Sequence, residues 1–340
     1  MLARSGSGVS GAYCSGAGST GASGTDDLYL PVGHWQVGVG YRWQMSDRPF
    51  MGTEEQFERE RLGTVSVNRI HLFDVALSYG LTRRVVLTAS VPFVIASRTR
   101  PGNFDRVLGI PNAPDQVYKS VGFGDVGVSA RMWLIRPPAE KRQNISIGIG
   151  IKLPTGKKDV HDDVNTPAGR QNRYVDQSIQ LGDGGFGVSV DVMAFKSLKH
   201  FTLFSSGTYL FNPRNTNGVP ASRPRPSEAV MSISDQYLAR AGVAVPIRQI
   251  RGFAVNFGGR IEGVPATDIF GKSDGFRRPG YAVSVEPGII YLRKKDAWSV
   301  NVPIAVRRNR LASVPEIRDN VFDAAAFADY LIVVGYVRRF

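Results

Sequence analysis

The sequence predicts an all-β protein that forms a single transmembrane antiparallel up-and-down β-barrel of about 12 strands, and three observations predict it. Segments of roughly ten residues alternate between apolar and polar side chains, and the connections between them alternate between long and short. The 38 glycines and 20 prolines among 340 residues disfavour long helices. No stretch approaches the roughly 18 consecutive apolar residues of a membrane helix, so only strands are available to cross a bilayer.

Residues 34–44 show the alternation most clearly. Successive side chains of a strand point to opposite sides, so the tryptophans, valines and tyrosine of this segment share one face, and glutamine, glycine and arginine share the other. The segments 143–153 and 297–307 repeat the pattern with mostly isoleucine or valine on the apolar face. The same reasoning predicts strands at 34–44, 67–80, 84–95, 123–135, 143–153, 185–195, 200–211, 236–247, 251–261, 280–292, 297–307 and 328–340.

The connections between these strands indicate the geometry of the sheet. Five breaks are about 3–7 residues long and six are about 18–31 residues long, and the two kinds alternate strictly. All long connections therefore fall at one end. Long external loops, short periplasmic turns and termini on the periplasmic side are typical of an outer-membrane barrel. A strand of about 11 residues tilted near 40° projects to roughly 25–28 Å, which matches the apolar band of such barrels.

Aromatic residues at the ends of the apolar faces distinguish a barrel from a soluble β-sandwich or propeller. Those folds explain the alternation equally well, because they bury one face of each strand against protein. They explain less well the aromatic ends and the opposite faces rich in glycine, serine and charge. We therefore predict a membrane girdle formed by Trp35, Trp43, Phe201, Tyr209, Tyr281, Tyr291, Trp298 and Tyr330.

Charged residues in the predicted strands fall mainly on the face opposite the apolar one. A charge exposed to lipid at mid-bilayer costs roughly 2–4 kcal/mol for arginine or lysine, so these residues are expected to line the lumen. Two interpretations stay open: a polar pathway whose basic excess favours anions, or an interior closed by ion pairs such as Arg260–Glu286. The candidates for lining the lumen are Arg42, Asp74, Asp125, Arg131, Lys152, Asp191, Arg240, Arg260, Glu262, Glu286 and Arg307.

Composition and motifs argue against several other classes of function. Lys+Arg 42 against Asp+Glu 29 give a net charge of +13, but no basic helix or aromatic stacking platform points to nucleic acid. The four histidines are scattered and none stands in a nucleophile motif, so we expect no enzyme. The spacing of cysteine and histidine predicts no metal site, and we expect no cofactor.

The first 30 residues differ in composition from the rest. They are rich in glycine and serine and lack the apolar core of a signal peptide, so we expect a flexible segment at 1–30 and a barrel over 31–340. Export then requires a start upstream of Met1 or a signal that has been removed. The single cysteine, Cys14, excludes an internal disulfide.

Motifs along most of residues 30–340 resemble those of a known family. The matching segments are HWQVGVGYRWQMSDR (34–48), DVALSYGLTRRVVLTASVPF (74–93), GFGDVGVSAR (122–131), IGIGIKLPTGK (147–157), GDGGFGVSVDV (182–192) and YLIVVGYVRRF (330–340). They resemble the Gram-negative outer-membrane transporter family that includes the outer-membrane proteins assigned to the MetA pathway of phenol degradation. The resemblance implies a location in the outer membrane of a Gram-negative bacterium and a porin-like channel for passive passage of small molecules, with aromatic or hydrophobic compounds as the class of solute.

The C-terminal segment also resembles the signal by which barrel-assembly machinery selects its clients. Phe340 is the last residue and Tyr336 lies in phase with it, whereas Arg338 departs from the usual apolar residue. An ordinary amphipathic last strand is the alternative interpretation. The expected partners are outer-membrane lipids, the barrel-assembly machinery and a small-molecule solute, with no nucleic acid; the oligomeric state is not predicted. A non-transporting structural or surface-interaction barrel, closed by ion pairs, is the alternative function.

Overall fold

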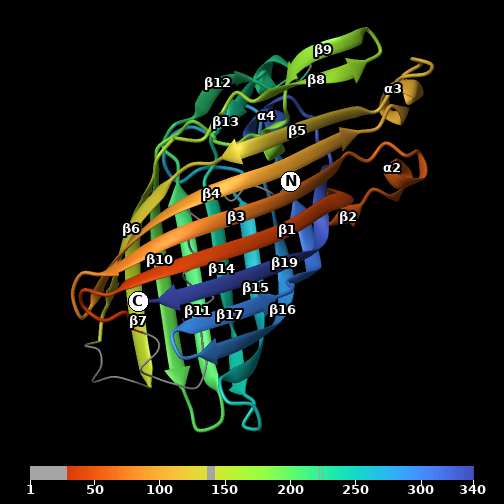
Figure 1. Ribbon diagram of the computed structural model, residues 1–340. Coiled ribbons are helices and arrows are strands. Elements are labelled where there is room, and N and C mark those ends of the chain that lie inside the picture. The colour runs from red at the N-terminus through yellow and green to blue at the C-terminus, as the bar shows by residue number, and fades with distance from the viewer. Residues whose placement is uncertain (1–28, 136–141, 222, 224) are drawn as a thin grey trace.

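A computed structural model describes residues 29–135, 142–221, 223 and 225–340, and it shows a closed antiparallel β-barrel (Figure 1). The main sheet contains 15 strands, of which β2 (Glu54–Glu55) only extends the edge of the first strand into a loop. Among the other 14 strands, two pairs each share one position around the wall. The wall therefore has twelve strand positions, which we call staves. The strands of the wall are β1 (Trp35–Met51), β3 (Val67–Gly80), β4 (Val85–Arg100), β5 (Gln116–Phe123), β6 (Gly127–Trp133), β7 (Gln143–Lys152), β10 (Gly187–Ser197), β11 (Thr202–Phe211), β14 (Gln236–Pro246), β15 (Phe253–Val264), β16 (Gly280–Arg293), β17 (Asp296–Asn301), β18 (Ile304–Arg310) and β19 (Ala325–Arg339).

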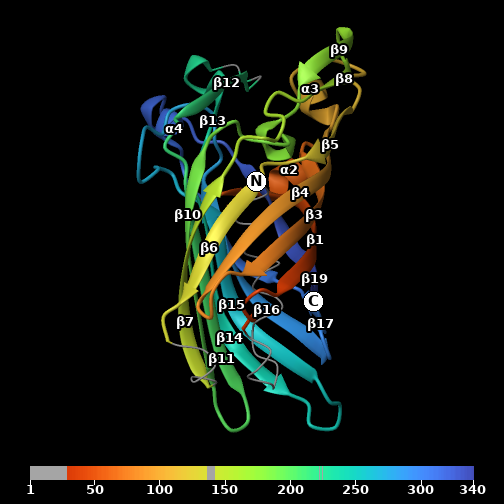
Figure 2. The same cartoon turned by 60° about the vertical axis from the view of Figure 1, so that its left-hand side comes forward.

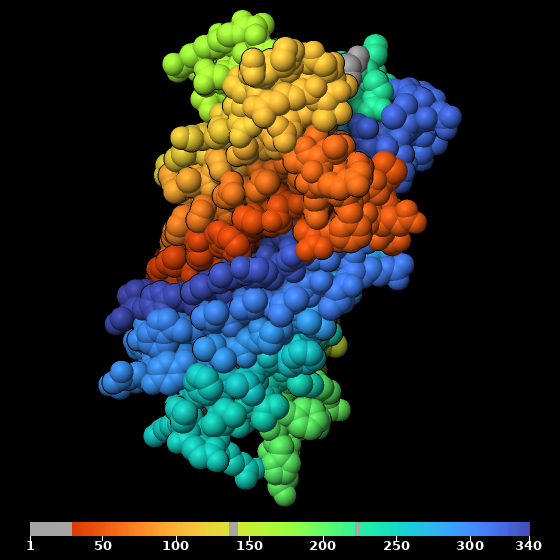
Figure 3. All heavy atoms as spheres, turned by 90° about the vertical axis from the view of Figure 1, so that its right-hand side faces the viewer, coloured from red at the N-terminus to blue at the C-terminus, as the bar shows by residue number. Residues whose placement is uncertain are grey.

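The first and last strands close the barrel. β1 pairs antiparallel with β19 from Gln36↔Arg339 to Phe50↔Ala325, and the Phe340 backbone N donates to the Trp35 carbonyl oxygen at 2.9 Å. Closure removes the free edges that an open sheet would present to other chains. The strands run obliquely to the long axis, and they appear as diagonal bands on the surface (Figure 3).

The predicted strand pattern is confirmed, with two interruptions that the sequence pattern did not reveal. The stave predicted at 123–135 consists of β5 and β6, and β5 begins at Gln116, inside a predicted loop. The stave predicted at 297–307 consists of β17 and β18. A register shift between Val283↔Arg307 and Ser284↔Ala305 adds one residue to β18 and reverses the facing of the residues that follow.

Long connections and short turns lie at opposite ends of the barrel, as predicted (Figure 2). The long connections carry two hairpins and five short helical elements, and no helix in the described ranges has the length and apolar character needed to span a bilayer. These elements are α2 (Phe57–Arg61), α3 (Asn103–Val107), β8 (His161–Thr166), β9 (Gly169–Tyr174), η2 (Gln177–Ile179), β12 (Thr216–Pro220), η3 (Pro226–Glu228), β13 (Val230–Ser232) and α4 (Val314–Arg318).

The barrel is apolar outside and polar inside. On the outer face of β7, Ile149 is 60% exposed, whereas Lys152 at the end of the same strand is 0% exposed and Arg260 of β15 is 2% exposed. Exposed apolar residues cover most of the wall, which is the reverse of a soluble sandwich, where the apolar faces pack together. The soluble alternatives are therefore excluded for the described chain.

The predicted girdle residues lie on the outer face, and several of them contact other aromatic rings across strands. Trp35 contacts Tyr79 with a distance of 4.6 Å between ring centroids, and Trp43 contacts Tyr330 at 5.5 Å. Trp298 stacks on Tyr291 at 5.6 Å, close to the short turns. Trp35 is 46% exposed, and the other girdle residues are exposed or half-buried, so their rings can contact the interface layer of a membrane. These residues are Trp35, Trp43, Phe201, Tyr209, Tyr281, Tyr291, Trp298 and Tyr330.

The first described residues, Tyr29 and Leu30, and the C-terminal end of β19 lie at the short-turn end. Tyr29 and Leu30, the last two residues of the segment predicted to be flexible, are each 8% exposed. The rest of that segment, with Cys14, lies outside the described residues. At the other terminus, Tyr336 donates to Asp296 Oδ1 at 2.7 Å, and the Phe340 side chain is exposed. The role of Tyr336 and Phe340 as an assembly signal stays a prediction.

Candidate functional site

The interior of the barrel is the candidate site, and an aromatic cluster lies at its short-turn end. Tyr29 packs edge-to-face on Trp133 with 5.0 Å between the centroids, and Phe195 and Met193 complete the cluster. Asn144 Nδ2 donates to the Tyr29 hydroxyl at 2.9 Å, which satisfies the buried phenol. Tyr29, which precedes the first strand by six residues, thus enters the lumen from the side of the short turns.

A ladder of ion pairs lies further along the lumen, and we call it the ion-pair ladder. It links Arg42, Glu262, Arg260, Glu286 and Arg240 in that order, with N–O distances of 3.0, 2.6, 3.5 and 3.2 Å. The predicted Arg260–Glu286 contact is therefore present. The contact between β1 and β15 crosses the lumen, because three staves separate those strands in the sheet. Each charge of the ladder contacts at least one opposite charge, which compensates for its removal from water.

Glycines on the inner face of β7 make room for a second ion pair. Arg131 Nε and Nη2 both donate to Asp191 Oδ1, at 2.9 and 2.5 Å. Asp191 lies directly over Gly148, where a Cβ atom would come within 1.8 Å of the carboxylate. No side chain larger than hydrogen fits there without displacing the carboxylate.

Part of the segment 153–186, which follows β7, folds into the barrel, whereas its β8–β9 hairpin is largely exposed. Its helical turn η2 carries Ile179, which is 0% exposed. It packs with Val175 and Leu181 against the inner faces of β3 and β4, at Ile70 and Val94. This segment narrows the lumen beyond the ion-pair ladder.

Polar contacts hold this segment where the wall is interrupted between β5 and β6. Asp125 lies in that gap, and its carboxylate accepts from the backbone N of Gly156 at 2.9 Å and of Asp183 at 3.3 Å. Lys152 forms an ion pair with Asp183. Gly182 approaches Gly156 so closely that a Cβ atom on Gly182 would lie 2.2 Å from the Gly156 carbonyl oxygen. The break in the wall therefore serves as the attachment point of the inward segment.

A pocket of about 230 Å³ lies inside the loop end of the barrel, and we call it the arginine pocket. It lies between the ends of β1 and β4, the starts of β3, β5 and β19, and the six long connections. Asp176, at the start of η2, links it to the inward segment, because Arg98 and Arg223 lie 3.8 and 3.3 Å from its carboxylate. The charged and aromatic residues of the lining are Arg59, Arg98, Arg100, Phe104, Tyr118, Tyr174, Asp176, Arg223, Arg278 and Asp323.

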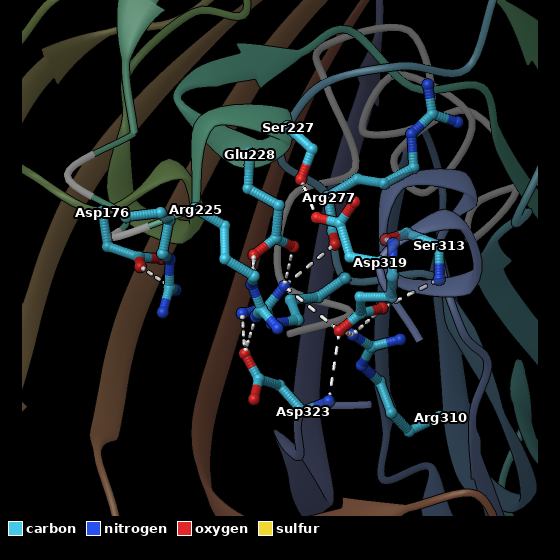
Figure 4. A network of polar contacts seen from close by, with 12 residues as sticks. Asp176, Arg225, Ser227, Glu228, Arg277, Arg310, Ser313, Asp319 and Asp323 are labelled. Carbon is cyan, nitrogen blue, oxygen red and sulfur yellow. Dashed lines mark hydrogen bonds and ion pairs between the residues drawn. The ribbon is translucent and has the colours of Figure 1, made fainter. Parts of the chain in front are cut away.

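A buried network of ion pairs, the loop network, supports one side of the arginine pocket (Figure 4). Arg278 contacts Glu228 at 2.9 Å and Asp323 at 3.1 Å, and Arg310 contacts Glu316 at 2.6 Å. Glu316 also completes a capping box with Ser313 at the start of α4. Burial by itself raises the pKa of Glu316 and of Asp323, but their arginine partners outweigh burial and lower both pKa values.

Two arginines of the pocket are less easily charged than usual. Burial lowers the pKa of Arg223 to about 10, and nearby Arg278 lowers it further, while Asp176 opposes the shift. Burial also lowers the pKa of Arg59, in α2, and Asp323 opposes that shift. Additional negative charge in this pocket would therefore stabilise the charged form of both arginines.

The structure places ten of the eleven lumen candidates on the buried side and corrects one. Arg307 is exposed, because the extra residue at Val306 turns it away from the inner face. Asp125 lies in the gap between strands rather than within one. That these residues line a path for solute stays a prediction. The ten inward residues are Arg42, Asp74, Asp125, Arg131, Lys152, Asp191, Arg240, Arg260, Glu262 and Glu286.

Sequence reasoning missed the arginine pocket. Arg98 lies beyond the predicted strand, which ends at 95, whereas β4 continues to Arg100 and turns both arginines inward. Arg223 and Arg278 lie in long loops, where no periodic pattern indicates facing. An even spacing from Val94 through Ala96 to Arg98 was the one signal available.

The histidines occupy separate places. His71 accepts from or donates to the Tyr41 hydroxyl at 2.9 Å on the outer wall, and His200 contacts Arg248 at 2.7 Å in the short turns. His34 lies beside β1, and His161 lies in the β8–β9 hairpin. Within the described residues, no group of three or more His, Cys, Asp or Glu side chains is placed to hold a metal ion.

Comparison with known proteins supports the fold. No protein-family model and no curated protein matches the chain. The COG4313 outer membrane channel from Pseudomonas putida F1 matches with a TM-score of 0.57 and 14% identity, over 92% of this chain and 97% of that chain. Less similar are the beta domain of the Bordetella autotransporter BrkA (TM-score 0.45, 10% identity, 91% and 100% covered) and the CymD monoaromatic hydrocarbon channel (0.44, 10%, 93% and 91%). The first likeness shows that this chain has the fold of an outer-membrane barrel.

Proposed function

We propose that this barrel is an outer-membrane channel for the passive passage of small molecules. One observation carries the proposal: a polar lumen is narrowed by the chain's own segment 153–186, between the arginine pocket and the ion-pair ladder. A barrel of twelve strands encloses more space than a barrel of eight, in which side chains fill the interior. It encloses less space than an open porin of 16–18 strands. An inward segment in a barrel of this size limits passage to small solutes.

The outer surface supports a location in the outer membrane of a Gram-negative bacterium. Its exposed apolar band and cross-strand aromatic pairs suit contact with lipid, and Phe340 at the C-terminus suits recognition by barrel-assembly machinery. Aromatic or hydrophobic compounds are the class of solute that the family resemblance implies. A link to phenol degradation by the MetA pathway rests on that resemblance alone.

Ion conductance in planar bilayers tests the channel. The wild-type protein should conduct above a protein-free bilayer, and Asp176→Asn should raise the conductance. Asp176 accepts from Ser178 N at 3.0 Å and bridges Arg98 and Arg223, so neutralising it loosens the inward segment. Asp163→Asn is the matched control, because Asp163 lies in the same connection but on the exposed β8–β9 hairpin.

Two results would contradict the proposal. Wild-type protein that inserts but never conducts would favour a non-transporting barrel whose lumen is closed by ion pairs. Equal conductance of Asp176→Asn, Asp163→Asn and wild type would show that the segment 153–186 does not set the width of the path.

A further inference from the structure

The arginine pocket carries more positive than negative charge. Five arginines and two aspartates line it. Several of these arginines have carboxylate partners behind the lining: Arg100 contacts Asp105 at 2.6 Å, and Arg278 contacts Glu228 and Glu316. When Arg225 and Arg310, which share those carboxylates, are included, seven arginines face five carboxylates, an excess of two positive charges. The network does not neutralise itself.

Two hydrogen-bond donors of the lining have no partner in the described chain. The guanidinium of Arg59 has no hydrogen bond and no carboxylate within 4.0 Å, although its pKa responds to Asp323. Asn68 is 1% exposed, and its Nδ2 atom has no hydrogen-bond partner, while its Oδ1 accepts from Arg98 Nη1 at 2.9 Å. A buried donor without a partner costs free energy that an acceptor in the pocket would recover.

Aromatic side chains form part of the same lining. Phe104 lies under the Arg100 guanidinium, 4.5 Å from Cζ to the ring centroid, and Tyr118 and Tyr174 lie in neighbouring segments. A cavity of about 150 Å³ holds a benzene molecule in a protein core. The pocket, at about 230 Å³, therefore has room for one ring with a small substituent. Rings pack against aromatic side chains and arginine planes alike.

We propose that the arginine pocket binds small aromatic carboxylates. The carboxylate accepts hydrogen bonds from Arg59 and Asn68, and the ring packs against Phe104, Tyr118 and Tyr174. The inference rests on the proposed channel function. In such a channel, the pocket would be the first binding site that a solute meets on the external side of the inward segment. It narrows the class of solute from aromatic compounds in general to those that carry a carboxylate.

Isothermal titration calorimetry on the full chain in detergent tests the site. Benzoate is the probe, with benzyl alcohol as a ring without charge and acetate as a carboxylate without a ring. Wild-type protein should bind benzoate at least tenfold more tightly than either, and more weakly as salt is added. Arg59→Gln should weaken benzoate binding about tenfold or more, because it removes a charged donor.

Arg61→Gln is the matched control for Arg59→Gln. Both arginines lie in α2, but the Arg61 side chain is 77% exposed and contacts Glu58. Benzoate affinity should be unchanged in this variant, and far-UV circular dichroism should show both variants folded. The proposal fails if wild-type protein does not bind benzoate, if acetate or benzyl alcohol binds as tightly, or if Arg59→Gln binds like Arg61→Gln.

Failure of this inference is distinguishable from failure of the channel. Calorimetry reports binding without transport, and planar-bilayer conductance reports transport without this ligand. Conductance without benzoate binding would leave a channel for other solutes and overturn the site alone.

Discussion

The ion-pair ladder and the arginine pocket are both rich in arginine, yet they are built differently. The ladder stands on strands, and each of its charges, such as Arg260 between Glu262 and Glu286, lies against an opposite charge. The pocket is built by loops and strand ends, and the guanidinium of its Arg59 has no ion pair in the described chain. Charges that all have ion-pair partners on a rigid wall hold a structure together, whereas donors without a partner in a cavity are typical of a binding site.

The largest expected effect comes from removing the centre of the ladder. Arg260→Ala should lower the free energy of unfolding by about 1.5–3 kcal/mol, because Glu262 and Glu286 each lose one of their two arginine partners in a buried site. Urea unfolding in lipid vesicles measures the change. Arg307→Ala is the control on a neighbouring part of the wall, since Arg307 is exposed, and it should change stability by less than about 0.5 kcal/mol. Equal stabilities of the two variants would contradict the structural role of the ladder.

An intermediate effect is expected when the loop network is acidified. The pKa values of Glu316 and Asp323 are lowered in the folded protein, from ordinary values of 4.5 and 3.8, so their stabilisation is complete above those values. It is lost as the pH falls through the lowered values, because the unfolded loops then bind more protons. Limited proteolysis with pepsin between pH 5 and pH 2 should cut the loops before the barrel unfolds. Loops that stay resistant until the barrel itself unfolds would show that the network adds nothing of its own.

The smallest effect on stability is expected at the arginine pocket itself. Arg59→Gln should change the free energy of unfolding by less than about 0.5 kcal/mol, because the Arg59 side chain has no ion pair to lose. Urea unfolding without ligand is the measurement. A loss as large as that of Arg260→Ala would show that the pocket is structural, like the ladder, and would erase the contrast between the two regions.

The sequence alone determined the strands, their number and the faces of most of them. Alternation with a period of two is a local property, so it places Ile149 outside and Arg260 inside without knowledge of the rest of the chain. The Arg260–Glu286 contact was also predictable, because both residues lie on inner faces of neighbouring strands. The same local reasoning assigned Arg307 to the wrong face, because one extra residue in a strand reverses the facing of all residues that follow it.

Only the tertiary structure decided what occupies the lumen. The Arg42–Glu262 contact joins strands that are not neighbours, so it depends on the closure of the barrel. The inward packing of Ile179 and the approach of Arg59 and Arg223 to Asn68 of β3 depend on the paths of loops, which follow no repeating pattern. The alternation of side chains between two faces is a property of one strand. A site made from several loops exists only after the sheet has closed and brought the ends of those loops together.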